Sequence, residues 1–164
     1  MMLKNFCSIG LGNAGLLALL PALTGIALGG PMGQAASAYL VSLSPDQLPH
    51  AVTGTAGGNA QIPGAIVPSA HSSAECLGSA SFQANHQIQF ETVPSSLTIT
   101  VDSFGNTDTT LAIQTPDGEW LCGDDISSTN KDAAITIGKP TAGTYQVWVG
   151  TFDGGYADYE LTLD

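Results

Sequence analysis

The stretch "TLAIQTPDGEWLC", residues 110–122, decides how the rest of the sequence is interpreted. Two apolar runs flank a Pro-Asp-Gly triplet, and these residue types favour a tight turn. We therefore predict a β-hairpin, with Gly118 at the position that needs a positive φ. Cys122 ends the returning strand, and the paired carboxylates Asp124 and Asp125 follow it directly.

Short runs of the same kind surround this hairpin from Glu75 to the end of the sequence. Side chains alternate within them: Leu97, Ile99 and Val101 share one face, and the residues between them are polar. Turn-forming residues separate the runs, which read "SASFQA", "QIQFET", "LTITVDS", "TLAIQT", "EWLC", "AAITIG", "TYQVWVGTF" and "YELTL". About eight short strands predict an all-β, antiparallel, jelly-roll-like β-sandwich over residues 75–164. We expect each sheet to bury one face and expose the other.

The segment ahead of the predicted sandwich has a different composition. Gly, Pro, Ala and Ser dominate it, and it shows no hydrophobic period of a helix or a strand. We therefore predict a flexible or irregular segment over residues 39–74. The alternative is that it adds a strand to the domain, with Ile62, Ile66 and Val67 as apolar anchors.

Residues 1–38 have the layout of a secretory signal peptide. Lys4 precedes the apolar run "LLALLPALTGIALGG", and the small residues Ala-Ser-Ala end at Ala38. We predict cleavage between Ala38 and Tyr39 and a secreted or periplasmic product. An uncleaved membrane anchor is the alternative, but the run is short, rich in glycine and broken by a proline.

The charge balance limits the classes of partner. The net charge is −11, the chain has no arginine, and only two lysines, Lys131 and Lys139, remain after the predicted cleavage. Such a surface repels nucleic acids and anionic membranes, and it favours divalent cations or cationic partners. We therefore expect no nucleic-acid partner, and no membrane contact after cleavage.

The cysteines predict one disulfide. Cys7 belongs to the predicted signal peptide, so Cys76 and Cys122 remain as a pair in an oxidising compartment. A bridge that closes a loop of this length stabilises a fold by about 4 kcal/mol on the chain-entropy model. Two free thiols are the alternative.

No motif in the sequence indicates an enzyme. There is no G-x-S-x-G elbow, no HExxH and no CxxC, and His50 and His71 lie in the segment predicted to be irregular. We therefore predict a non-enzymatic accessory or binding module. The alternative is a small secreted hydrolase that uses two carboxylates.

Acidic and amide side chains in the loops form a candidate calcium site. Calcium takes six to eight oxygen ligands, which loops at one end of a sandwich are able to supply. The candidate ligands follow the hairpin or precede it: Asp124, Asp125, Asn130 and Asp132 on one connection, and Asn106 and Asp108 on the other. No D-x-D-x-D-G loop is present, and the alternative is that these carboxylates are solvated turn residues.

An aromatic face is a further candidate for binding. In "TYQVWVGTF", Trp148 and Phe152 lie on the face opposite Tyr145 and Val147. If that face is outward, these aromatic side chains would bind a sugar or a protein partner. The alternative is that Trp148 is a core residue because both faces of the sheet are covered.

Two stretches resemble the bacterial pre-peptidase C-terminal domain family. "AGTYQVWVGTFDGGYADYELTL", residues 142–163, is similar to the Gly-x-Tyr turn, Val-rich strand, glycine loop and Tyr-x-Leu strand that end those domains. "DTTLAIQTPDGEWLCGDD", residues 108–125, resembles their middle hairpin. The resemblance covers residues 76–164.

This resemblance implies an exported β-sandwich that serves as an accessory module beside a secreted hydrolase. Relatives in the collagen-binding group hold calcium in acidic loops. Their ligand positions do not map onto this sequence residue by residue, so calcium is a hypothesis from the acidic residues of this chain. A protein or a polysaccharide is the expected class of partner.

Overall fold

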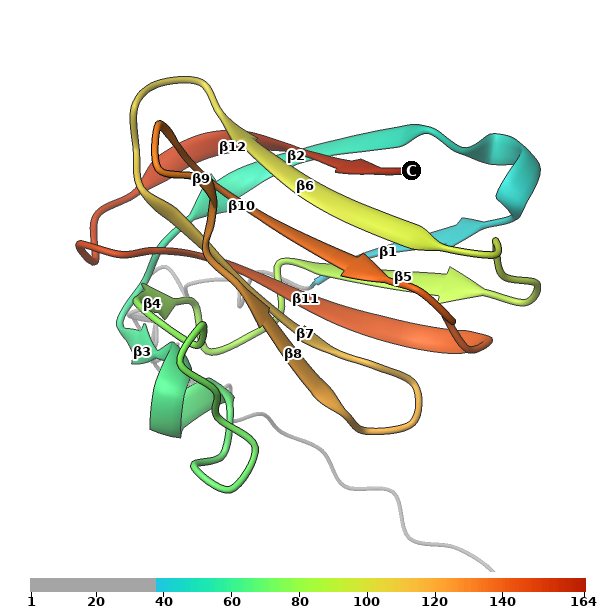
Figure 1. The fold of residues 1–164 in the computed structure, drawn as a ribbon, viewed down its shortest axis with the longest axis horizontal. Coiled ribbons are helices and arrows are strands. Elements are labelled where there is room, and N and C mark those ends of the chain that lie inside the picture. The colour runs from blue at the N-terminus through green and yellow to red at the C-terminus, as the bar shows by residue number, and fades with distance from the viewer. Residues whose placement is uncertain (1–37) are drawn as a thin grey trace, which may run out of the picture. The chain divides into compact units, whose positions relative to one another are not determined.

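A computed structural model describes residues 38–164 (Figure 1). The predicted signal peptide and Cys7 lie outside the described residues, except for Ala38. No helix among residues 38–164 is long and apolar enough to cross a membrane.

The described chain is a sandwich of two β-sheets, which confirms the predicted all-β class. The first sheet contains β1 (Tyr39–Leu43), β3 (Ala60–Gln61), β4 (Ser79–Ala80), β5 (His86–Phe90), β7 (Thr109–Gln114), β8 (Trp120–Gly123) and β11 (Gly143–Thr151). The second contains β2 (His50–Ala56), β6 (Leu97–Ser103), β9 (Asp125–Ser127), β10 (Asn130–Ile137) and β12 (Ala157–Leu163). Each of the eight predicted runs contains a strand, and β9 is the strand that the prediction missed within residues 75–164.

The predicted hairpin is present as the β7–β8 pair. The strands pair in antiparallel register from Leu111 opposite Gly123 to Gln114 opposite Trp120. Gly118 in the connecting turn has φ +82°, the left-handed conformation that the turn requires.

Alternating side chains fill the space between the sheets. Leu97, Ile99 and Val101 are all buried, and they pack in one cluster with side chains from β5, β7, β11 and β12. Phe90 and Tyr145 meet edge to face in that cluster, with ring centroids 6.2 Å apart. The main core therefore sits between the two sheets, as the period of two predicted.

The prediction of an irregular segment over residues 39–74 is wrong for its two main strands. β1 pairs with β5 in parallel, an exception to the expected antiparallel arrangement, and β2 pairs with β12 along its full length. Gly54 lies on the inward side of β2 and leaves room for Tyr159, because a Cβ at Gly54 would lie 2.5 Å from the hydroxyl of Tyr159. The large side chain that fills this layer belongs to β12, so β2 shows little apolar alternation of its own.

The outer face of the first sheet is covered as well, which corrects the expectation that each sheet exposes one face. Residues 60–84 fold over it and bury Ile62, Ile66 and Val67, the anchors that the alternative had named. Cys76 and Cys122 form the predicted disulfide in this second cluster. Two of the short elements that build the cover are β3 and the single turn Ile62–Ile66.

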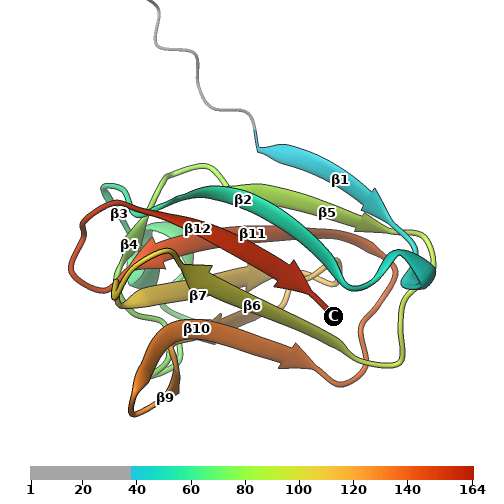
Figure 2. The same ribbon diagram turned by 90° about the horizontal axis from the view of Figure 1, so that it is seen from above.

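The two long sides of the sandwich differ. On one side the chain passes from β8 of the first sheet directly into β9 of the second. On the other side β2 and β1 are the outer strands of their sheets. Figure 2 shows β1, β2 and β5 along one side, and β9 and β10 along the opposite side.

Candidate functional site

The crossing from β8 to β9 brings three predicted ligands together. Asp108 directly precedes β7, and Asp124 directly follows β8. Because Leu111 pairs with Gly123 in antiparallel register, the start of β7 lies beside the end of β8. Asp108 therefore meets Asp124 and Asp125, and we call these three residues the acidic corner.

Gly123 allows the chain to make this crossing. A Cβ at Gly123 would lie 2.4 Å from the carbonyl oxygen of Ala134 in β10, so the two sheets approach here at backbone distance. The Thr109 hydroxyl, at the start of β7, accepts a hydrogen bond of 3.0 Å from the backbone N–H of Ala133. These contacts close the side of the sandwich on which the acidic corner lies.

The carboxylates of the acidic corner converge without hydrogen-bond donors for several of their oxygens. One ligand atom from each of Asp108, Asp124 and Asp125 lies within 4.8 Å of the other two. Oδ1 of each is buried and accepts no hydrogen bond from residues 38–164. A buried carboxylate oxygen without a partner is unfavourable, and a cation compensates it.

The electrostatics of the acidic corner favour protons or cations. Burial raises the pKa of Asp124 above its ordinary value, and the charges of Asp125, Asp108 and Glu75 raise it further. Burial also raises the pKa of Asp108, as do Asp125 and Asp153. Positive charge near these groups therefore lowers their free energy.

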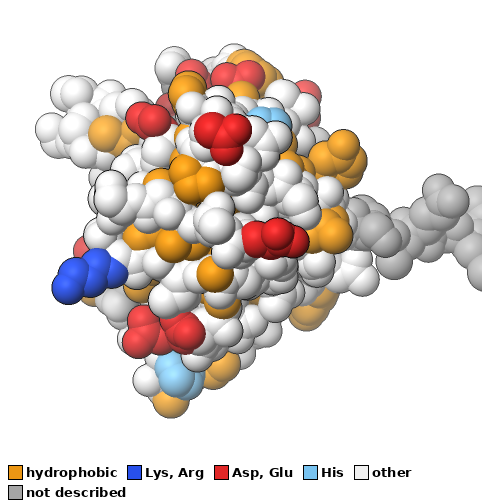
Figure 3. Space-filling view, turned by 90° about the vertical axis from the view of Figure 1, so that its right-hand side faces the viewer, with side chains coloured by type: hydrophobic (Ala, Val, Ile, Leu, Met, Phe, Trp, Pro, Cys, Tyr) orange, Lys and Arg blue, Asp and Glu red, His pale blue; other side chains and the backbone are white. Residues whose placement is uncertain are grey.

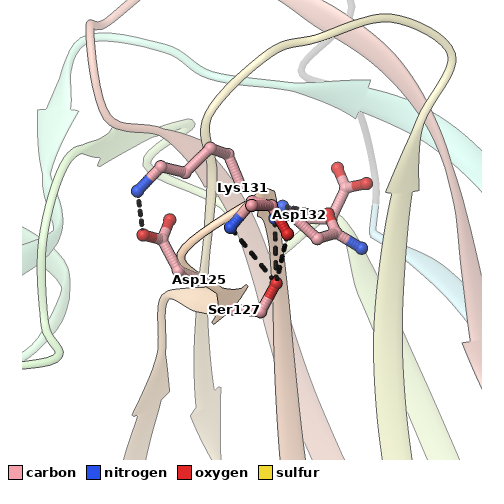
Figure 4. Close-up of polar contacts among 6 residues, drawn as sticks. Asp125, Ser127, Lys131 and Asp132 are labelled. Atoms are coloured by element: carbon pink, nitrogen blue, oxygen red, sulfur yellow. Dashed lines mark hydrogen bonds and ion pairs between the residues drawn. The ribbon is translucent and has the colours of Figure 1, made fainter.

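Lys131 is the cation at this corner. Its ammonium group pairs with Oδ2 of Asp125 across the β9–β10 hairpin (Figure 4). Lys131 also lowers the pKa of Asp108 and Asp124, against the other effects. Lys131 was not among the residues predicted for the site, although a lysine six residues after Asp125 is within reach across a hairpin.

The other three predicted ligands lie outside the acidic corner. Asn106, Asn130 and Asp132 line a small hollow of about 260 Å³ beside β10. Oδ1 of Asp132 accepts a hydrogen bond of 3.0 Å from the backbone N–H of Ser103, and Oδ1 of Asn130 accepts one of 3.0 Å from that of Asp132. Figure 4 shows Asp132 on the side of β10 away from Asp125. The side chains of Asp132 and Asn130 thus satisfy backbone N–H groups at the end of β6 and at the start of β10.

Trp148 and Phe152 do not share an open face. Trp148 is 7% exposed and packs against Trp120 in the covered layer, with ring centroids 5.2 Å apart. Phe152 is 52% exposed, in the connection after β11. The structure thus places Trp148 in a core cluster, as the alternative expected.

Comparison with known proteins finds distant structural similarity only. No protein-family model matches the chain, and a search of curated proteins finds no match. The chain is similar to the pre-peptidase C-terminal domain of collagenase from Bacillus anthracis, with 14% identity, a TM-score of 0.43, and coverage of 78% of this chain and 95% of that one. It is also similar to PliG from Aeromonas hydrophila, a periplasmic lysozyme inhibitor of g-type lysozyme, with 12% identity, a TM-score of 0.34, and coverage of 78% and 96%.

Proposed function

We propose that the chain is an exported, non-enzymatic β-sandwich module whose acidic corner binds calcium. The observation that carries this proposal is the convergence of Asp108, Asp124 and Asp125, each with a buried oxygen that accepts no hydrogen bond from the protein. The disulfide between Cys76 and Cys122 supports export, because such bonds persist in oxidising compartments.

The donor set matches calcium better than zinc or copper. The three converging groups are all carboxylates, which are hard oxygen ligands, and calcium prefers such ligands. Calcium also tolerates irregular geometry and accepts backbone oxygens and water as additional ligands. Magnesium demands a stricter octahedral arrangement and keeps more of its water, so we expect weaker binding of magnesium.

Thermal unfolding of the oxidised protein tests the proposal. The midpoint is measured in EDTA and then across a calcium titration, with a magnesium titration in parallel. An ion that binds only the folded state stabilises it by about 2.7 kcal/mol when its concentration is 100 times Kd. We expect a rise of the midpoint that saturates with calcium and is smaller with magnesium.

Asp124→Asn is the decisive variant, because its two effects have opposite signs. In EDTA we expect a higher midpoint than wild type, since the variant removes a carboxylate that burial and like charges destabilise. In calcium we expect the rise to be lost. Asp102→Asn is the matched control, because Asp102 is exposed on β6 and the change in charge is the same.

Equal calcium responses of the two variants and wild type would show charge screening at the surface and overturn the site. Conversion of a substrate by the purified protein, lost in Asp124→Asn, would favour the hydrolase alternative over a non-enzymatic module.

A further inference from the structure

A second candidate site lies on the side of the sandwich opposite the acidic corner. There a cleft of about 650 Å³ opens between β2 and β5, and its lining includes residues of β1 and β12. This volume falls within the range of small-molecule sites in proteins. We call it the edge cleft.

The edge cleft is neutral in a strongly acidic protein. Its lining contains no Asp, Glu, Lys or Arg among the described residues, although the chain carries a net charge of −11. Its polar side chains are hydroxyls and amides, such as those of Thr53, Ser81 and Gln83. A charged ligand therefore finds no side chain of opposite charge in the cleft.

Aromatic side chains surround the edge cleft and are unusually open to solvent. Tyr39 is 68% exposed, Phe82 is 73% exposed and Tyr156 is 70% exposed, and all three line the cleft. They come from three separate parts of the chain: the start of β1, the connection before β5 and the connection before β12. Exposed aromatic side chains gathered at one cleft indicate a binding surface rather than a packing layer.

A buried polar pair lies among the residues that line the cleft. Nε2 of His86 and the hydroxyl of Tyr159 are 2.8 Å apart, and His86 is only 3% exposed. Nδ1 of His86 has no hydrogen-bond partner in the protein. Whichever nitrogen carries the proton, the pair leaves hydrogen-bonding capacity that the protein itself does not satisfy.

We propose that the edge cleft binds a neutral oligosaccharide. Sugar rings have apolar faces that stack on aromatic side chains, and their hydroxyl groups both donate and accept hydrogen bonds. The exposed rings of Phe82 and Tyr156 match the first property, and the hydroxyl, amide and imidazole groups match the second. A purely apolar ligand would leave the exposed side chains of Thr53 and Gln83 without partners, and an ionic ligand would lack a counter-charge.

Two-dimensional NMR of the labelled, oxidised protein tests this proposal. The probes are cellotriose, maltotriose and triacetylchitotriose, each at millimolar concentration, with trigalacturonate as the anionic comparison. We expect at least one neutral trisaccharide to shift the backbone amides of Gly54, Thr55 and His86, and trigalacturonate to leave them unchanged.

Variants separate stacking from general surface effects. Replacing Phe82 or Tyr156 by Ala should weaken binding about fivefold, since each removes one aromatic contact of roughly 1 kcal/mol. Phe152→Ala is the matched control: Phe152 is an exposed aromatic residue that does not line the cleft. Tyr159→Phe removes only the hydroxyl and should weaken binding; it should also lower the thermal midpoint, because Nε2 of the buried His86 loses its partner, so binding is compared well below that midpoint.

The proposal is overturned if no neutral trisaccharide shifts the cleft amides, or if Phe152→Ala weakens binding as much as Phe82→Ala. Shifts at these amides that depend only on protein concentration would identify a surface for a second copy of the chain instead. The acidic corner contributes no residue to the cleft, so failure of calcium binding leaves this test unaffected.

Discussion

The two long sides of this sandwich differ in whether the gap between the two sheets is closed. On the side of β8 and β9, the chain crosses between the sheets, the backbones touch at Gly123, and carboxylates gather where the chain turns. On the side of β2 and β5, the sheets stay apart, and neutral and aromatic side chains line the opening. Where the backbone crosses from one sheet to the other, polar groups gather at that edge. Where the sheets stay apart, side chains that line the space between them reach solvent.

Figure 3 shows carboxylates scattered over one face of the protein, with neutral atoms between them. The acidic corner and the edge cleft differ from such a mixed surface in opposite ways: the first gathers carboxylates, and the second has no charged side chain in its lining among the described residues. The predictions below test this contrast.

Gly123→Ala should have the largest effect on the free energy of unfolding. Its Cβ would approach the carbonyl oxygen of Ala134 and the side chain of Ile135 at 2.4 and 2.7 Å, so the backbone must move. We expect a loss of about 3 kcal/mol in the free energy of unfolding, measured by urea denaturation. If Gly123→Ala lowers the free energy of unfolding less than Gly54→Ala does, the two sheets are not closely packed on the side of β8 and β9.

Gly54→Ala is the matching change on the open side. The new methyl group would meet the Tyr159 hydroxyl at 2.5 Å, but this is the end of a side chain beside a cleft. We expect a loss of about 1 kcal/mol, together with disruption of the hydrogen bond between Tyr159 and His86. Denaturation measures the first, and the NMR signals of the His86 ring report the second.

Lys131→Gln should increase the affinity of the acidic corner for calcium. Lys131 pairs with Asp125 at the protein surface, and calcium competes with its ammonium group for that carboxylate. Removing it should raise calcium affinity about fivefold, because the Asp125 carboxylate then binds calcium without first releasing an ammonium partner. Isothermal titration calorimetry measures the change, with Lys139→Gln as the control, and unchanged affinity would place calcium elsewhere.

The two sides should also respond to pH in different windows. Burial lowers the pKa of His86, so its contribution to stability is present above its unfolded pKa of about 6.5 and is lost as pH falls through the folded value. The pKa of Asp108 and Asp124 is raised instead, so their contribution is full below about pH 4 and is lost as pH rises through their folded values.

Thermal midpoints in EDTA from pH 7 to pH 4 check these signs. His86→Gln should remove the loss of stability on acidification near the upper end of this range. Asp124→Asn should reduce the gain near the lower end. These effects are the smallest of the series. An unchanged profile in His86→Gln would contradict the lowered pKa of His86, because a histidine with equal pKa values in the folded and unfolded states adds no pH dependence to stability.

The sequence was sufficient to predict the hairpin, every strand after Glu75 except β9, and the disulfide. The meeting of Asp108 with Asp124 also follows from the hairpin, because the turn at Gly118 sets the register between β7 and β8. Asn130 was placed with them because it lies on the same connection. A register shift between Asn130 and Ala133 in the β9–β10 pair changes which groups on this connection face the corner.

The edge cleft was beyond the reach of the sequence because no local pattern marks it. Its walls depend on the pairing of β1 with β5 and of β2 with β12, and β2 looks irregular because Gly54 makes room for Tyr159. The burial of Trp148 has the same kind of cause. It depends on residues 60–84, which reach the sheet through buried apolar anchors and a disulfide rather than through a periodic strand.

The pairing of β2 with β12 has a consequence for how the protein folds. β2 precedes most of the described strands, yet its partner β12 follows all of them, and β12 also pairs with β6. A topology with such distant partners has a high contact order and folds slowly. The second sheet cannot close until Leu163 is available, so a chain truncated before β12 would leave β2 and β6 without their shared neighbour. Folding as one cooperative unit, once β12 is available, is the route that this topology favours.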